Sequence, residues 1–364
     1  MKITRIKSQR VQLPTEEPLA GGPPFYRPFH EFVALDVETD AGIEGIGITT
    51  FMGPLAPTLK HAVDQLGALA IGEDPLRIEA IGQKLRGAAG SARAGLFTLA
   101  FSAIDMALWD IKGKALGQSL ALMLGGLREH VPTYASGALL RSYSLDQLLK
   151  SGRLLVEKGF RQMKTQLALP GETTAAREVE RVRLLREAVG PDIDLMCDIN
   201  QRWSVNQAID IGSRIEDVHL FWLEDVTAHD DYAGLARVAD ALVTPLAGGE
   251  CLYGVTPFRH MLEARSVDIV MIDLVRVGGI FNWMKVAGMA EAFNVPVVSH
   301  VLPEIDVHLI SAVPNGLTVE YMPWSFRLFE EVPVPVNGEL AVPTKPGLGL
   351  AFDRDAIKRY SVAA

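Results

Sequence analysis

The first part of the chain, up to about residue 128, combines segments with strand-like and helix-like patterns. Apolar and polar residues alternate, as they do in half-buried strands, over residues 3–13, 30–40 and 43–50. The turn-forming run Thr39-Asp40-Ala41-Gly42 separates the last two segments, which predicts a hairpin. Helical periodicity follows over residues 59–70, 76–86 and 96–124. We therefore predict an N-terminal α+β domain whose last helix ends at Gly125-Gly126.

From residue 131 onward the pattern changes to a repeat of short apolar strand, polar turn and longer helical stretch. The predicted strands are residues 133–136, 162–166, 195–199, 220–224, 246–250, 269–273, 295–300 and 317–320. The helical patterns between them include residues 175–189, 205–215, 232–241, 257–264 and 281–292. Eight strands that alternate with helices over roughly 190 residues match the size of a TIM-type barrel. No G-x-G-x-x-G motif follows a first strand, which argues against a dinucleotide-binding sheet.

These patterns divide the chain into three parts. Residues 1–128 are predicted to form a capping domain, and residues 129–325 a barrel domain. Residues 326–364 are rich in Pro and Val and are predicted to pack back onto the capping domain. The predicted fold class is therefore α/β, a TIM-type (β/α)7β barrel with an N-terminal α+β capping domain completed by the C-terminal segment. Gly and Pro residues within 19–28 predict a loop, which is a candidate lid.

Composition and charge restrict the class of partner. The chain has 364 residues, of which 48% are hydrophobic and 22% charged, as in ordinary globular proteins. It carries 35 Lys and Arg residues against 44 Asp and Glu residues, so its formal net charge is −9. A nucleic-acid-binding protein normally presents a basic face, and the sequence contains no Lys/Arg cluster. We therefore expect a small-molecule partner and no nucleic acid.

The sequence also predicts the cellular compartment. Cys197 and Cys251 are the two cysteines, too few for a disulfide framework, and both are interpreted as small core fillers. The N-terminal residues are charged and alternating, so they lack the apolar core of a signal peptide. The longest apolar run, residues 96–109, is interrupted by Asp105, so no membrane span is expected. These features predict a cytoplasmic protein.

Three acidic residues end successive predicted strands. Glu224 follows Asp198 by 26 residues, and Glu250 follows Glu224 by another 26, which is one strand–helix unit each time. On a barrel this spacing places three carboxylates side by side at the C-terminal rim, where active sites of this fold lie. Each residue alone could simply cap a helix, but three in register favour a site. Carboxylates this close need a cation, and ligands that are all oxygen favour Mg²⁺.

The series of polar residues continues along the next strands. Asp273 and His300 end neighbouring strands, and such an Asp fixes the tautomer of the imidazole and raises its basicity. His300 is therefore the candidate general base, whereas His308 has no such partner and is interpreted as structural. Glu320 ends the last strand. Lys164, within the strand 162–166, is predicted to face the barrel mouth and to bind an anionic substrate.

The ordered set of motifs resembles the mandelate racemase / muconate lactonizing enzyme branch of the enolase superfamily over essentially the whole chain. The resemblance rests on residues 107–114, 159–161 with Lys164, 198–201, 223–225, 249–250, 278–279 with Asp273, and 299–300. It implies that Asp198, Glu224 and Glu250 bind Mg²⁺ and that the Asp273–His300 dyad is the base. It further implies that Glu320 hydrogen-bonds an enolate, that Ser136 contacts the substrate carboxylate, and that the protein is a homo-oligomer. Abstraction of a proton α to a carboxylate is the expected chemistry.

The sequence departs from the family pattern at one position. Mandelate racemase-like members carry Lys-x-Lys on the second barrel strand, and here the motif is Lys164-Thr165-Gln166. Gln cannot take a proton, so a two-base racemisation lacks its second base. A single imidazole suits syn elimination of water from a hydroxy acid, which predicts an acid-sugar (aldonate or aldarate) dehydratase with His300 as base and acid. The alternatives are a racemase, epimerase or lactone cycloisomerase that uses Lys164 and His300, and a barrel that binds a carboxylate without catalysis.

The remaining candidates concern substrate binding. Tyr26, Arg27 and His30 are predicted to contact the distal end of a polar substrate, although the aromatic residues of this loop could equally serve to anchor it. Gln166 and Asn200 complete the predicted substrate-binding set, together with Lys164 and Ser136. The pair Gly278-Gly279 is interpreted as a tight turn into a helix, because no P-loop Lys follows it.

Overall fold

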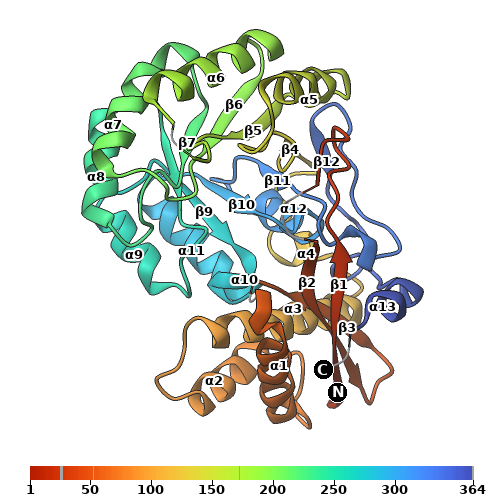
Figure 1. Ribbon diagram of the computed structural model, residues 1–364. Helices are drawn as coiled ribbons and strands as arrows, with labels where there is room; N and C mark the ends of the chain where they lie inside the picture. Colours follow the sequence, from red (N-terminus) through yellow and green to blue (C-terminus); the bar gives the residue numbers. More distant parts are fainter. Residues whose placement is uncertain (25–27, 52, 172, 363–364) are drawn as a thin grey trace.

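The N-terminal part forms a three-stranded antiparallel sheet covered by helices (Figure 1). The computed structural model describes residues 1–24, 28–51, 53–171 and 173–362. The strands are β1 (Ile3–Pro14), β2 (Phe29–Thr39) and β3 (Glu44–Thr49), in that order, and a tight turn with Gly42 at φ 72° joins β2 to β3. All three agree with the predicted strands to within one or two residues. The predicted hairpin is therefore confirmed.

The helices of this part are α1 (Ala56–Ala70), α2 (Ile78–Ala88), α3 (Leu96–Leu116) and α4 (Leu120–Met123), preceded by the 3-10 turn η1 (Gly53–Leu55). Helix α3 is buried along nearly its whole length, and Gly47 lets it lie directly on β3. A Cβ atom on Gly47 would come within 2.0 Å of the Ala103 carbonyl oxygen. The single helix predicted over 96–124 is wrong, because Gly117 adopts the left-handed conformation (φ 64°) and ends α3.

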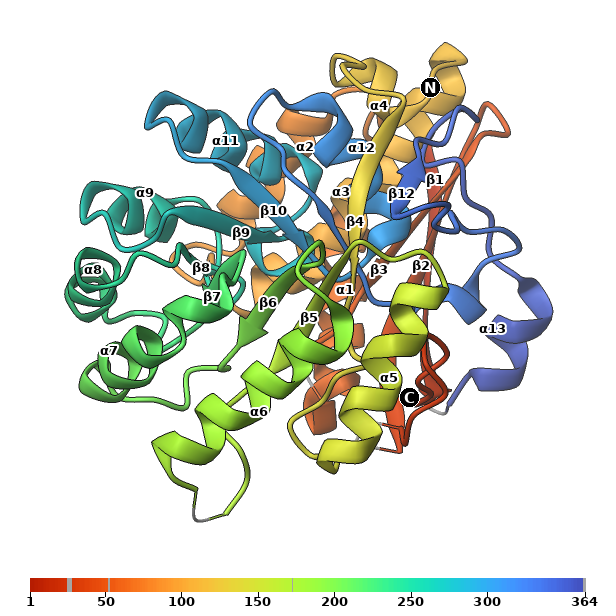
Figure 2. The ribbon, with the colours of Figure 1, turned by 90° about the horizontal axis from the view of Figure 1, so that it is seen from above.

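Eight parallel strands form the barrel, in the spatial order β10-β9-β8-β7-β6-β5-β4-β11 (Figures 1 and 2). They are β4 (His130–Ala135), β5 (Gln162–Gln166), β6 (Asp194–Asp198), β7 (Trp222–Glu224), β8 (Leu246–Gly248), β9 (Ile269–Asp273), β10 (Val297–His300) and β11 (Val319–Tyr321). The Leu317 N–H donates to the Val297 carbonyl, which joins the two end strands and nearly closes the barrel. Large side chains such as Trp222 and Met271 fill its interior, so the barrel is a packed core.

Helices on the outside connect consecutive strands, as a (β/α)7β barrel requires. They are α5 (Leu145–Glu157), α6 (Ala175–Val189), α7 (Val205–Arg214), α8 (Tyr232–Ala241), α9 (Thr256–Glu263), α10 (Leu274–Val277), α11 (Ile280–Ala292) and α12 (Pro303–Ala312), with the 3-10 turn η2 (Glu216–Val218). Gly278 and Gly279, at φ 95° and 94°, make the turn between α10 and α11, as predicted. None of the described helices is long and apolar enough to span a membrane. The predicted fold class is confirmed.

The C-terminal segment runs back along both parts of the molecule (Figure 1). Its elements are η3 (Phe326–Leu328), β12 (Glu339–Ala341) and α13 (Arg354–Tyr360). Strand β12 pairs with β4 of the barrel, whereas the Val362 N–H donates to Arg10 on β1 and the Leu348 N–H donates to the buried Asp110 of α3. This segment therefore connects the barrel to the N-terminal sheet and helices.

Candidate active site

A cavity of about 710 Å³ lies between the C-terminal ends of the barrel strands and the N-terminal part of the chain. Its walls include His30 and Phe51 from the N-terminal part and Lys164, Asp198 and His300 from the barrel. A volume of this size suits a small molecule. The cavity is therefore the candidate active site, and the predicted polar residues converge on it.

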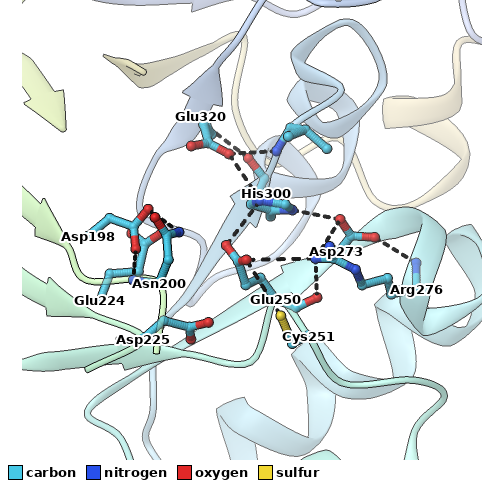
Figure 3. Close-up of polar contacts among 12 residues, drawn as sticks. Asp198, Asn200, Glu224, Asp225, Glu250, Cys251, Asp273, Arg276, His300 and Glu320 are labelled. Carbon is cyan, nitrogen blue, oxygen red and sulfur yellow. Dashed lines mark hydrogen bonds and ion pairs between the residues drawn. The ribbon is translucent and has the colours of Figure 1, made fainter. Parts of the chain in front are cut away.

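The three predicted metal ligands lie on neighbouring strand ends around one space (Figure 3). Asp198 and Glu224 are paired in register on β6 and β7, and Glu250 follows β8; all three are buried. Burial raises the pKa of Asp198 and of Glu224, and the charge of a neighbouring carboxylate adds to the effect. The Lys164 charge opposes these shifts without cancelling them, so the cluster favours a further positive charge. Its oxygen-only donor set fits Mg²⁺, which these residues would hold.

Two residues near Glu250, Asp225 and Cys251, have no role in the site predicted from the sequence. The oxygen and sulfur atoms of Asp225, Glu250 and Cys251 lie within 4.8 Å of one another. Gln201 Nε2 donates to Asp225 (3.3 Å) and to the Cys251 sulfur (3.2 Å). The interpretation of Cys251 as a core filler is therefore wrong. Strand alternation does not apply there, because β8 ends at Gly248 and the chain turns at Gly249 (φ 123°).

His300 and Asp273 form the predicted dyad at the ends of β10 and β9. His300 Nδ1 lies 2.6 Å from Asp273 Oδ2, and Nε2 lies 3.0 Å from Glu250 Oε2 (Figure 3). Burial lowers the pKa of His300, but the Glu250 charge and the Asp273 hydrogen bond raise it more, so its pKa lies well above the ordinary value. His308 lies elsewhere, buried between a backbone N–H and a backbone carbonyl, as a structural residue would.

Arg276 connects the metal ligands to the dyad, and the sequence analysis did not identify it. Its Nη1 donates to the Glu250 carbonyl (2.9 Å) and lies 3.8 Å from carboxylate oxygens of Glu250 and Asp273. Its guanidinium also stacks on the Phe51 ring, 4.1 Å from the ring centre, and this ring stacks on His300 at 5.9 Å. The only signal in the sequence is the position of Arg276 three residues after Asp273.

Lys164 lies between two carboxylates on the barrel floor. Its Nζ is 2.5 Å from Glu224 Oε1 and 2.7 Å from Glu320 Oε1, and all three side chains are buried. Burial alone would lower the pKa of Lys164, but these two carboxylates raise it well above the ordinary value. Glu320 Oε2 accepts a hydrogen bond from the Val301 N–H (2.7 Å). Lys164 is thus a cationic donor, and not a base, in this arrangement.

Gln166 and Asn200 lie together on the wall formed by β5 and β6. Asn200 donates to Asp198 through its side chain (2.6 Å) and its backbone N–H (2.7 Å), and Gln166 Nε2 donates to Asn200 Oδ1 (3.3 Å). Arg141, another residue that the sequence analysis did not identify, donates to the same Asn200 oxygen. Ser136, which is predicted to contact the substrate carboxylate, is buried and lines the cavity.

Three residues of the N-terminal part are predicted to contact the substrate, and the structure describes one of them, His30. Tyr26 and Arg27 lie outside the described residues. His30 does line the cavity and stacks on Trp324, with ring centres 4.3 Å apart. The described part of the candidate lid is attached to the barrel, because the Tyr143 hydroxyl donates to the Pro23 carbonyl at 2.6 Å.

Comparisons with known proteins agree with this geometry. Residues 27–125 match the family model of the mandelate racemase / muconate lactonizing enzyme N-terminal domain, and residues 147–356 match the enolase C-terminal domain-like model. The chain is 32% identical over 326 residues to an L-talarate/galactarate dehydratase of Salmonella typhimurium, which covers 89% of this chain and 81% of that protein. It is 30% identical over 363 residues to a 3,6-anhydro-alpha-L-galactonate cycloisomerase of Streptomyces coelicolor, covering 99% of each chain. Among solved structures, L-talarate dehydratase from Polaromonas sp., complexed with Mg and L-glucarate, superimposes with a TM-score of 0.91 at 31% identity and covers 100% of this chain and 98% of that one.

Proposed function

The chain belongs to the mandelate racemase / muconate lactonizing enzyme branch of the enolase superfamily, and from that premise we propose that it is a Mg²⁺-dependent acid-sugar dehydratase. Its substrate is an aldonate or an aldarate, and its product is the 2-keto-3-deoxy acid. The observation that carries the proposal is the asymmetry of the cavity. His300, supported by Asp273, lies on one wall, whereas the position of the second family base is taken by Gln166.

The chemistry follows from the weak acidity of a proton next to a carboxylate. Removal of this proton places a second negative charge on the same group, and Mg²⁺, held by Asp198, Glu224 and Glu250, supplies charge stabilisation there when bound. Lys164, whose Nζ lies between Glu224 and Glu320, donates to the same carboxylate. Burial would raise the pKa of Glu320, but the charges of Lys164 and His300 outweigh burial and hold this pKa below its ordinary value. Glu320 therefore hydrogen-bonds the enolate only after it takes up a proton, because an ionised carboxylate only accepts.

His300 performs both proton transfers. Its Nε2, the ring nitrogen that Asp273 does not engage, accepts the α-proton, while Asp273 stabilises the imidazolium through Nδ1. The same Nε2–H then protonates the β-hydroxyl group, which leaves as water, and the enol converts to the keto acid. Elimination is therefore syn, with proton and hydroxyl on one face. Ser136 contacts the substrate carboxylate, and Asn200, Gln166 and the loop residues Tyr26, Arg27 and His30 contact the rest of the substrate.

Proton NMR of the Mg²⁺-loaded protein in D₂O, with a panel of aldonates, aldarates and α-hydroxy acids, tests the proposal. We expect the signals of one substrate to disappear while those of a 2-keto-3-deoxy acid appear. His300→Asn should abolish this reaction, since a positioned base contributes about 10²–10⁴-fold, and turnover that survives this change contradicts the role of His300. Exchange of the α-proton with inverted configuration would instead require a second base.

A cycloisomerase is the second candidate, because the Streptomyces coelicolor relative is a 3,6-anhydro-alpha-L-galactonate cycloisomerase and an Agrobacterium fabrum relative is a D-galactarolactone cycloisomerase. The same NMR experiment separates the two functions, since cycloisomerisation consumes a lactone or anhydro sugar acid without loss of water. If calorimetry detects binding of a carboxylate whose α-proton does not exchange with solvent, the result would favour a barrel that binds a carboxylate and does not catalyse.

We also propose that the chain acts in the cytoplasm as a homo-oligomer, with residues 129–325 as the catalytic domain and residues 1–128 and 326–364 as the cap. The two free thiols, Cys197 and Cys251, support a reducing compartment. Size-exclusion chromatography with light scattering measures the assembly, and a monomer mass would contradict this part of the proposal.

A further inference from the structure

Two arginine side chains on the cavity wall have no role in the proposed mechanism. Arg141 lies in the loop after β4, Arg202 lies just after β6, and both line the cavity. Across the described residues, neither guanidinium lies within 4.0 Å of a carboxylate oxygen. Lys164, Arg276 and His300, which also line the cavity, each contact at least one carboxylate. Neither Arg141 nor Arg202 therefore forms an ion pair with an acidic side chain of the described chain.

The surroundings of Arg141 show that its charge has only partial compensation. Its Nη2 donates to the Asp198 carbonyl oxygen (3.3 Å) and to Asn200 Oδ1, which holds the side chain against the wall. Its Nε is buried and has no hydrogen-bond partner within the described part of the chain. An anionic group on a ligand would therefore stabilise the guanidinium in this position.

The chemistry of the ligand follows from the shape of the guanidinium. Its planar fork pairs with both oxygens of a carboxylate, and such charge-assisted bonds are among the strongest in proteins. We infer that Arg141, with Arg202 beside it, binds a second carboxylate of the substrate. The substrate class is then the aldarates, which carry a carboxylate at each end, and not the aldonates. This inference rests on the proposed function, in which the metal ligands and Lys164 receive the first carboxylate.

The test compares pairs of substrates that differ only at C6. Galactarate with galactonate, and glucarate with gluconate, share their other carbons and differ in one carboxylate. We expect the wild type to prefer the diacid of the productive pair. Arg141→Met should lower kcat/KM for the diacid by roughly 10- to 100-fold, as expected for loss of a hydrogen bond to a charged group. The monoacid should stay within about 3-fold, since it lacks the group that Arg141 binds.

Two further variants show whether charge or geometry matters. Arg141→Lys retains the charge without the fork and should restore part of the diacid preference. Arg214→Met removes a guanidinium on the outer helix α7, where it pairs with Asp210, and should leave both substrates unaffected. An equal loss for diacid and monoacid in Arg141→Met would mean that Arg141 only supports Asp198 and Asn200, and the inference would be wrong.

Calorimetry separates this inference from the proposed function. The Mg²⁺-loaded wild type and Arg141→Met are titrated with the same pairs, whether or not product forms. Tighter binding of the diacid that disappears in Arg141→Met supports the second carboxylate site even if no dehydration is detected. Equal binding of diacid and monoacid by the wild type refutes it even if dehydration occurs. 6-Phosphogluconate is included because guanidinium also binds phosphate, and tighter binding than glucarate would refute the aldarate assignment.

Discussion

Replacing Asp273 by Asn should remove most of the activity, because the change inverts the tautomer of His300. Asp273 Oδ2 accepts from His300 Nδ1 at 2.6 Å, while Oδ1 accepts from the backbone N–H groups of Val275 (2.9 Å) and Arg276 (2.6 Å). A carboxylate accepts all three bonds with its two oxygens, whereas a carboxamide has only one oxygen. When the imidazole is neutral it therefore carries its proton on Nδ1, which leaves Nε2, 3.0 Å from Glu250 Oε2, as the nitrogen that can accept a proton.

The size of the activity loss follows from the two hydrogen-bond arrangements that the side chain can adopt in Asp273→Asn. The amide oxygen can keep both backbone N–H groups while the NH₂ group donates to His300 Nδ1, or it can keep the imidazole and leave two buried N–H groups unsatisfied. Each unsatisfied buried donor costs about 1–3 kcal/mol. The first arrangement is therefore favoured by about 2–6 kcal/mol. It places the proton on Nε2, so the active tautomer falls by roughly 30- to 10⁴-fold.

The assay is the initial rate of keto acid formation and of α-proton exchange in D₂O, on the best substrate of the panel. ¹⁵N NMR of the imidazole reports the tautomer directly, with His300→Asn to assign the signal. Asp306→Asn is the matched control, because Asp306 is a buried carboxylate near the dyad whose two oxygens have no partner in the described structure. If Asp273→Asn keeps more than about a tenth of the rate while folded, or if Asp306→Asn loses as much, the tautomer argument is wrong.

Three further predictions concern stability. Burial lowers the pKa of His308 to about 4, so the unfolded chain takes up a proton before the folded one as the pH falls below the ordinary value of 6.5. The free energy of unfolding in urea should therefore fall by about 2 kcal/mol between pH 8 and 5, and His308→Gln should lack this loss. An equal pH dependence in both proteins would contradict the shift. Gly279→Ala should destabilise the protein by about 1–3 kcal/mol, because the new Cβ would lie 2.5 Å from Asp105 Oδ2 at φ 94°. Gly288→Ala, within the following helix α11, meets nothing within 4 Å and should not lower Tm. Mg²⁺ at 100 times its Kd should raise the free energy of unfolding by about 2.7 kcal/mol and should restore the activity that is lost in EDTA. A Tm that does not change with Mg²⁺ would contradict the metal site.

Much of the barrel could be predicted from the sequence because its strands are buried on both faces and stop at a polar residue. The predicted bounds of β5 and β9 agree with the structure. The break between α3 and α4 was missed, since the apolar periodicity continues across Gly117. It depends on the C-terminal segment, where the Gly347 carbonyl accepts from the Leu120 N–H at the start of α4. Contacts between residues so distant in the chain leave no periodic signal.

The sequence by itself determined which carboxylates share the rim, because parallel strands in register bring every strand end to the same face. That is why Asp198 and Glu224 pair in the structure, and why Asp273 meets His300. Only the tertiary structure decided how the segments that follow the strands complete the site. Arg141 and Arg276 reach the cavity from segments without a repeating pattern, and the direction of their side chains depends on what packs against them. The position of a strand end is set by the repeat, whereas the conformation of a loop is set by its neighbours.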